Sequence, residues 1–260
     1  MRKGVRKMHK VFNFNKRNQK TRKIDNVGTL KFDSTDNENA QLYFYGDIAS
    51  ESWQSYCYDE DKCPQDILDF LSELDNYKAI DIYINSGGGS VSGGLAIYNI
   101  LSRHNGFKTV HVDGIAASIA SVIALAGDKV IIPSTAMFMI HKPWSWCEGN
   151  ADDMRKEADS LDTCQKTITN VYMDNVQEGI EESVITDMVN KETWLTGTEA
   201  QKYFNIEVEE SNEAAACCNS LFYDKYHNTP KDIKKMDENN KDNTLDIKNK
   251  LQMELDLLNM

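Results

Sequence analysis

The chain has 260 residues and a mass of 29.6 kDa, enough for one large domain or two small ones with a proper core. Hydrophobic residues make up 40% and charged residues 27%, which is typical of globular proteins, and the lack of any 18-residue apolar stretch excludes a transmembrane helix. The net charge is −12, but residues 1–24 hold ten Lys/Arg and no acidic side chain, so residues 25–260 carry −22. This acidic body argues against a nucleic-acid-binding core.

The two ends of the chain are polar. Residues 1–38 show no clear hydrophobic periodicity, so we expect a disordered basic arm, with a removable leader or a polyanion-binding arm as alternatives. The arm lacks the apolar run of a secretory signal, which favours reduced thiols and a cytoplasmic location. Residues 213–260 are expected to form a polar extension with a short amphipathic helix at 245–258. No zinc or redox spacing relates the six cysteines, so we expect no metal site. They are Cys57, Cys63, Cys147, Cys164, Cys217 and Cys218.

Between these ends, strand and helix patterns alternate. We expect strands at 41–46, 79–84, 109–112, 129–132 and 136–140, and helices from Pro64 and at 91–103 and 116–126. This alternation predicts an α/β fold of parallel βαβ units with right-handed crossovers. A long helix at 151–176 has few apolar positions and is expected to pack outside its own domain. Helices at 181–190 and 197–204 and a strand at 206–208 follow.

The segment Asn85-Ser-Gly-Gly-Gly-Ser90 joins an expected strand to an expected helix. Its glycines allow a close approach of another backbone or of a ligand, and helix N-termini present free N–H groups. It lacks the Lys of a Walker loop and the second Gly of a Rossmann loop. From these residues alone it is an oxyanion hole, a phosphate cradle or a tight turn.

Two further positions follow strand ends. Ser118, among small residues, fits a nucleophile at a strand-to-helix junction or an ordinary helix N-cap. His141 comes directly after the strand at 136–140 and fits a general base or a structural histidine. Serine catalysis needs a serine, a base and N–H donors, and the three segments supply all of them at equivalent ends of successive βα units.

These three segments resemble the signatures of the ClpP family, the proteolytic subunits of Clp proteases. The matching runs are Ile84-Asn-Ser-Gly-Gly-Gly-Ser-Val91, Gly114-Ile-Ala-Ala-Ser118 and Met139-Ile-His-Lys-Pro143. The resemblance covers residues 42–208 and is strongest to the ClpP-related proteases of phages and prophages that mature the capsid. It implies a ClpP/crotonase-like fold over residues 39–212 with a protruding handle helix at 151–176.

The resemblance also implies the roles of site residues. Ser118 would be the nucleophile, His141 the general base, and the backbone N–H groups of Gly88 and Ile119 the oxyanion donors. Glu192 stands where the cellular family has the Asp of its triad, with Asp187 as the alternative. Gly87 replaces the proline that is usual in the first signature.

The implied activity is that of a cofactor-free serine endopeptidase acting on peptide or protein substrates. The family forms heptameric rings, often stacked in pairs, so a homo-oligomer is expected, with a Clp-type ATPase or phage capsid proteins as partners. Neither a membrane nor a nucleic acid is expected to bind the core. The location would be the bacterial host cytoplasm or the phage prohead. Two alternatives stay open: an inactive ring-forming scaffold and a crotonase-type enzyme acting on a CoA thioester.

Overall fold

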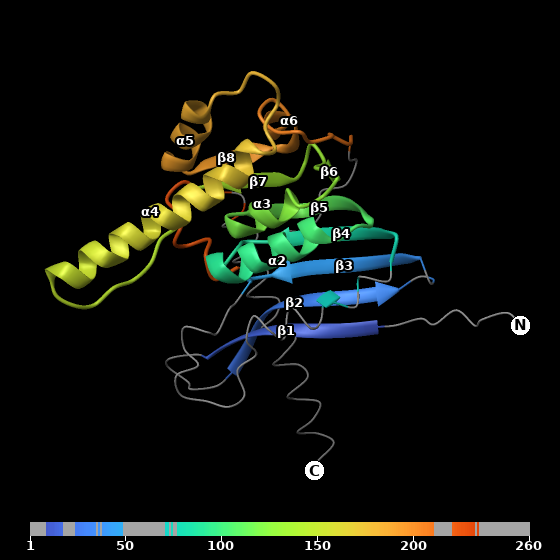
Figure 1. Ribbon diagram of the computed structural model, residues 1–260, viewed down its shortest axis with the longest axis horizontal. Coiled ribbons are helices and arrows are strands. Elements are labelled where there is room, and N and C mark those ends of the chain that lie inside the picture. The colour runs from blue at the N-terminus through green and yellow to red at the C-terminus, as the bar shows by residue number, and fades with distance from the viewer. Residues whose placement is uncertain are drawn as a thin grey trace, which may run out of the picture.

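The computed structural model describes residues 9–17, 24–34, 36, 38–48, 71, 72, 74, 77–210, 220–231 and 233. Within them, one sheet has the strand order β1-β2-β3-β4-β5-β7-β8, and β6 pairs with β5 beside this path. Helices α2 and α3 lie against one face of the sheet, and α4 projects away from it (Figure 1). The α/β fold with a protruding helix that the sequence predicts is therefore confirmed.

The centre of the sheet is parallel. It consists of β3 (Asn39–Gly46), β4 (Ala79–Ser86), β5 (Phe107–Ala117), β6 (Lys129–Ile131) and β7 (Met137–Ile140). Each neighbouring pair in the path from β3 to β7 is parallel, so the carboxyl ends of these strands share one edge. Loops that leave this edge are where active sites of parallel sheets form.

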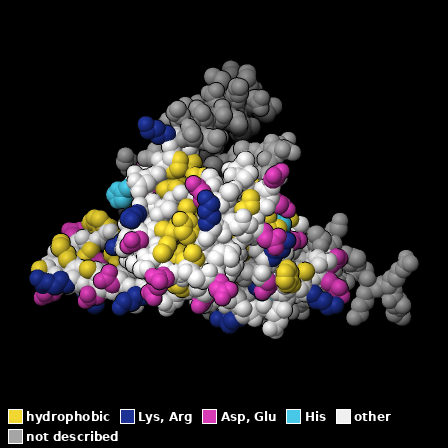
Figure 2. Space-filling model, turned by 90° about the horizontal axis from the view of Figure 1, so that it is seen from above, with side chains coloured by type: hydrophobic (Ala, Val, Ile, Leu, Met, Phe, Trp, Pro, Cys, Tyr) yellow, Lys and Arg dark blue, Asp and Glu magenta, His cyan; other side chains and the backbone are white. Residues whose placement is uncertain are grey.

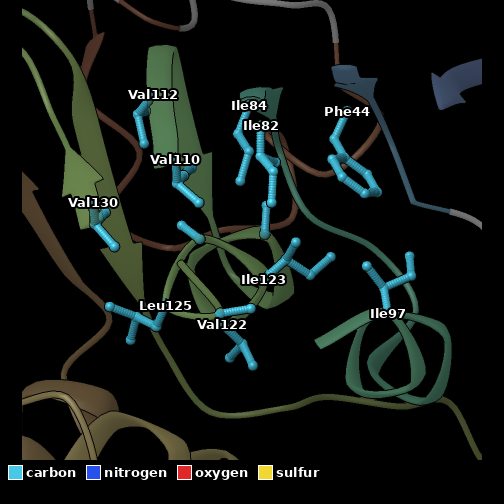
Figure 3. Close-up of a cluster of buried hydrophobic side chains, with 14 of the residues drawn as sticks. Phe44, Ile82, Ile84, Ile97, Val110, Val112, Val122, Ile123, Leu125 and Val130 are labelled. Carbon is cyan, nitrogen blue, oxygen red and sulfur yellow. The ribbon is translucent and has the colours of Figure 1, made fainter. Parts of the chain in front are cut away.

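Two helices cover the central strands. Helix α2 (Val91–Arg103) begins at Ser90, whose side chain accepts a hydrogen bond from the Gly93 N–H. Helix α3 (Ile119–Ala124) begins three residues later than the sequence predicts, because Ala116 and Ala117 stay in β5 and pair with β7. Its side chains Val122 and Ile123 meet the strand residues Ile82, Ile84 and Val110 in the core (Figure 3).

The expectation of disorder for residues 1–38 is wrong over 9–17 and 24–34. There β1 (His9–Arg17) and β2 (Ile24–Ser34) pair antiparallel, and β2 adds antiparallel to β3. Side chains of both strands alternate in burial, so a polar sequence still presents one apolar face to the core. The buried members are Phe12, Phe14, Leu30 and Phe32.

The chain after β7 forms α4 (Ala151–Met173), α5 (Glu182–Asn190), β8 (Thr193–Thr196) and α6 (Gly197–Ala200). The buried side chains of α4 all lie in its last six residues, and the projecting part carries acidic and basic groups (left in Figure 2). Strand β8 was not predicted, and α6 is shorter than the expected helix at 197–204. The expected strand at 206–208 is reduced to one bridge between Ile131 and Glu207.

Several expectations fall outside the described residues. They concern most of the helix from Pro64, the helix at 245–258, and Cys57, Cys63, Cys217 and Cys218. Cys147 and Cys164 are described and carry free thiols. Among the helices of the described ranges, none is both long enough and apolar enough to cross a membrane.

Candidate active site

Ser118 lies between β5 and α3, in a backbone conformation that residues other than glycine rarely adopt. Its φ is 56° and its ψ is −128°, and its N–H donates to the Met139 carbonyl at 2.9 Å. Such a conformation costs about 1–3 kcal/mol and persists only where the surroundings enforce it. The surroundings include Ser121, whose hydroxyl donates to the Ser118 carbonyl at 2.6 Å and also contacts the Tyr172 hydroxyl at 2.8 Å. The turn holds the Ser118 side chain at the carboxyl edge of the sheet.

His141 reaches Ser118 from the neighbouring strand. It follows the last residue of β7, and its Nε2 lies 2.7 Å from the Ser118 Oγ. Burial lowers the pKa of His141 to about 4, while the charge of Glu192 raises it and that of His227 lowers it further. The imidazole is therefore neutral near pH 7 and can accept the hydroxyl proton.

Gly88 lies directly beside Ser118. Its φ is +99°, and a methyl group at this position would come within 2.7 Å of the Ser118 Cβ. The Gly88 N–H donates to the Ser86 hydroxyl at 3.1 Å. Ile119 is the first residue of α3, where an N–H has no carbonyl partner within the helix. The structure thus brings both expected oxyanion donors to the turn that carries Ser118.

Glu192 lies across from His141, because β7 and β8 are antiparallel and Ile140 pairs with Thr193. Within the described residues, its carboxylate accepts hydrogen bonds from the backbone N–H groups of His227 and Asn228 at 2.8 and 2.6 Å and from the Trp194 indole N–H at 3.3 Å, and not from His141. The alternative acid, Asp187, is not brought to the site: its exposed carboxylate lies 3.8 Å from the Lys191 ammonium on the same helix.

A match to a known family covers the expected catalytic positions of this arrangement. The family model described as Clp protease matches residues 60–210, which include β4 through α6 and the five positions Gly88, Ser118, Ile119, His141 and Glu192.

The chain belongs to the Clp protease family.

Its relatives in this family are ATP-dependent Clp protease proteolytic subunits. The subunit of Ligilactobacillus salivarius is 35% identical over 137 residues, which are 52% of this chain and 68% of the relative. Those of Streptococcus mutans and Ostreococcus tauri are 35% and 29% identical, over 55% and 57% of this chain and 75% and 74% of the relatives. The chain is accordingly a serine-type peptidase, a hydrolase.

One part of the site lies beyond the region that matches the Clp protease family. Residues 220–231 and 233 return to the carboxyl edge of the sheet, where Tyr226 donates a hydrogen bond to the Gly87 carbonyl at 2.6 Å. A cavity of about 430 Å³ lies between this segment and the sheet edge, and Ser118 and His141 line it with Phe222 and Tyr226. No local pattern in the sequence marks a contact between positions 139 residues apart, so this segment could not be assigned to the site from the sequence.

Proposed function

We propose that the chain is an endopeptidase that hydrolyses peptide bonds through an acyl-enzyme on Ser118. The observation that supports this most is the 2.7 Å contact between the Ser118 Oγ and the His141 Nε2. Ser118 attacks the peptide carbonyl while His141 takes the hydroxyl proton. The proton then passes to the leaving amine as the C–N bond breaks. Water hydrolyses the resulting ester by the same route and restores the serine.

The N–H groups of Gly88 and Ile119 stabilise the negative oxygen of the tetrahedral intermediate. Preorganised donors of this kind act on charge that develops only during the reaction, and each is worth about 10²–10³ in kcat. Glu192 serves as the acidic partner that holds the His141 ring and stabilises its protonated form. This assignment is supported by its position opposite His141 and by the direction of its effect on the His141 pKa.

We extend the proposal to assembly and context. The relatives are named as subunits and as ATP-dependent, which supports a homo-oligomeric ring, heptameric and single or stacked, with a Clp-type ATPase as partner. The projecting α4 offers a surface for contacts between such rings. A role in maturing phage capsid or scaffold proteins, in a bacterial cytoplasm or a prohead, rests on the resemblance of the signature segments alone. The pairing of Ser118 with His141 favours a peptidase over a CoA-thioester enzyme, which works with carboxylates.

The test is hydrolysis of fluorogenic peptides by full-length chains. Ser118→Ala should lower the rate to background, because no other group replaces the attacking oxygen. Ser183→Ala is the control, since this serine lies exposed on α5 and its hydroxyl donates to the Glu181 carboxylate at 3.3 Å. A Ser118→Ala chain with the parental rate would overturn the proposal. A folded chain that assembles but hydrolyses no peptide, even when residues 220–231 are released from the site, would favour the scaffold.

A further inference from the structure

The segment of residues 220–231 is anchored beside the site at its first residues. The Ser220 hydroxyl and the Leu221 N–H donate to the two oxygens of the Asp47 carboxylate, at 2.6 and 2.9 Å. Asp47 follows β3 and is only 3% exposed. Charge-assisted hydrogen bonds to a buried carboxylate are among the stronger ones in proteins. They fix the point at which the segment enters the carboxyl edge of the sheet.

Tyr226 lies against both the oxyanion loop and the general base. Its hydroxyl donates to the Gly87 carbonyl, and a methyl group on Gly88 would lie 3.2 Å from that hydroxyl oxygen. Its ring meets the His141 ring edge-on, with 5.0 Å between the centroids, and the residue is 4% exposed. A reacting carbonyl must come to about 3 Å from both the nucleophile and the oxyanion donors. Tyr226 contacts the Gly87–Gly88 loop and the His141 ring, and so restricts the room for such a carbonyl.

The same segment also holds the acidic partner. The N–H groups of His227 and Asn228 bind the Glu192 carboxylate, and the Asn228 side chain donates to the Lys191 and Glu192 carbonyls. A carboxylate that accepts two backbone N–H groups is less available to the other ring nitrogen of His141. One short segment therefore touches the oxyanion loop, the base and the acid together.

The segment does not lie in the site as a substrate would. The N–H groups of Lys225 and Tyr226 donate to the Phe222 carbonyl at 2.8 and 3.2 Å, so this stretch is a compact turn. Peptides that are recognised through their backbone bind as extended strands. A turn whose carbonyl is bonded within itself blocks the site without offering a bond for cleavage.

The anchoring of the segment is separate from the main core. Tyr223, Tyr226 and Ile233 form a small cluster with Ile115, Ala117 and Met139, apart from the large cluster between the sheet and its helices. The segment also lies outside residues 60–210, the part that matches the Clp protease family. The catalytic fold can therefore release it without losing its own core.

We propose that residues 220–231 are a cis-acting inhibitory segment, and that peptide substrates gain access to Ser118 only when this segment is displaced. This inference rests on the proposed serine peptidase function. Displacement opens the space beside Gly88 and frees the Glu192 carboxylate to pair with His141. The intact chain is thus a latent form of the enzyme.

The test compares full-length variants in which the contacts between the segment and the site are weakened or left intact. Tyr226→Ala removes the side chain between the oxyanion loop and His141. Asn228→Pro keeps Tyr226 but deletes the backbone N–H donor to the Glu192 carboxylate and the side-chain donor to the Lys191 and Glu192 carbonyls, so the test stays decisive if Tyr226→Ala does not fold. Asp224→Ala is the matched control, because Asp224 is an exposed residue of the same turn. We measure the rate of Ser118 labelling by a fluorophosphonate, kcat/KM for a fluorogenic peptide, and hydrogen exchange of the segment amides.

We expect Tyr226→Ala and Asn228→Pro to exchange the segment amides faster and to raise both rates by about tenfold or more, through a shift toward the open form. Asp224→Ala should match the parent within about twofold. If the parent reacts at Ser118 as fast as both variants do, the segment is not inhibitory, while the proposed function stands. If Ser118 reacts in none of the chains even though the segment is released, the proposed function fails and the inference with it.

Discussion

Replacing Gly88 with alanine should damage catalysis far more than stability. The new methyl group would lie 2.7 Å from the Ala117 carbonyl oxygen and from the Ser118 Cβ. Favourable contacts with carbon atoms lie near about 3.5–4.0 Å, so the loop or the serine turn must move by roughly 1 Å. Both are backbone segments at the carboxyl edge of the sheet, and neither can rotate away as a flexible side chain could.

Gly88→Ala is expected to lower both the free energy of unfolding and kcat. The left-handed φ of +99° adds strain of about 1–2 kcal/mol to any residue with a Cβ, which lowers the free energy of unfolding. Moving the Gly88 N–H out of line with the oxyanion lowers kcat by a factor of about 10²–10³, which is equivalent to raising the activation barrier by about 3–4 kcal/mol. The loss of rate should therefore exceed what the loss of stability explains.

Gly179→Ala separates the effect of backbone strain on stability from the effect of the displaced oxyanion donor on kcat. Gly179 has a similar φ of +87°, but nothing lies within 4 Å of a methyl group there. This variant should lose about 1–2 kcal/mol of unfolding free energy in urea and keep the parental rate of peptide hydrolysis. The reasoning is refuted if Gly88→Ala hydrolyses peptides at the rate of Gly179→Ala.

Further outcomes follow from the His141 environment and the serine turn. The imidazole resonances of His141 should titrate near pH 4, and in Glu192→Gln at still lower pH because the carboxylate charge raises this pKa; titration near 6.5 would contradict the burial of the ring. A folded-state pKa below the unfolded value means that the unfolded chain binds more protons between pH 4 and 6.5. Unfolding free energy should therefore fall as pH falls through this window, and the fall should be smaller in His141→Gln. Ser121→Ala should slow acylation of Ser118 by about tenfold, since it removes the hydroxyl that holds the turn; an unchanged acylation rate in stopped-flow measurements would show that the turn needs no such support.

The sequence predicts the central elements well because their signals are local. Alternating apolar residues mark β4, and apolar residues at helical spacing mark α2, so their expected bounds match closely. Ser118 and His141 could be selected because each follows a strand, and the parallel sheet brings strand ends to one edge. The two side chains meet there at 2.7 Å.

The errors come from contacts between distant segments. The polar stretch with Phe12 and Phe14 forms a strand because it pairs with β2, which in turn pairs with β3 in the same sheet. Strand β8 has four residues, too few to reveal an alternation of apolar and polar side chains, and its position is set by pairing with β7. The residues next to Tyr226 in the sequence show no pattern that marks a site. Its place in the site follows only from its contacts with Gly87 and His141.

The central claim is that His141 activates Ser118 as a nucleophile. It is tested most directly by treating the full-length Tyr226→Ala chain with a fluorophosphonate and mapping the adduct by mass spectrometry. We expect one adduct, on Ser118, which disappears when His141→Ala is added to the same chain. An adduct on another residue, or labelling of Ser118 that persists without His141, would contradict the claim.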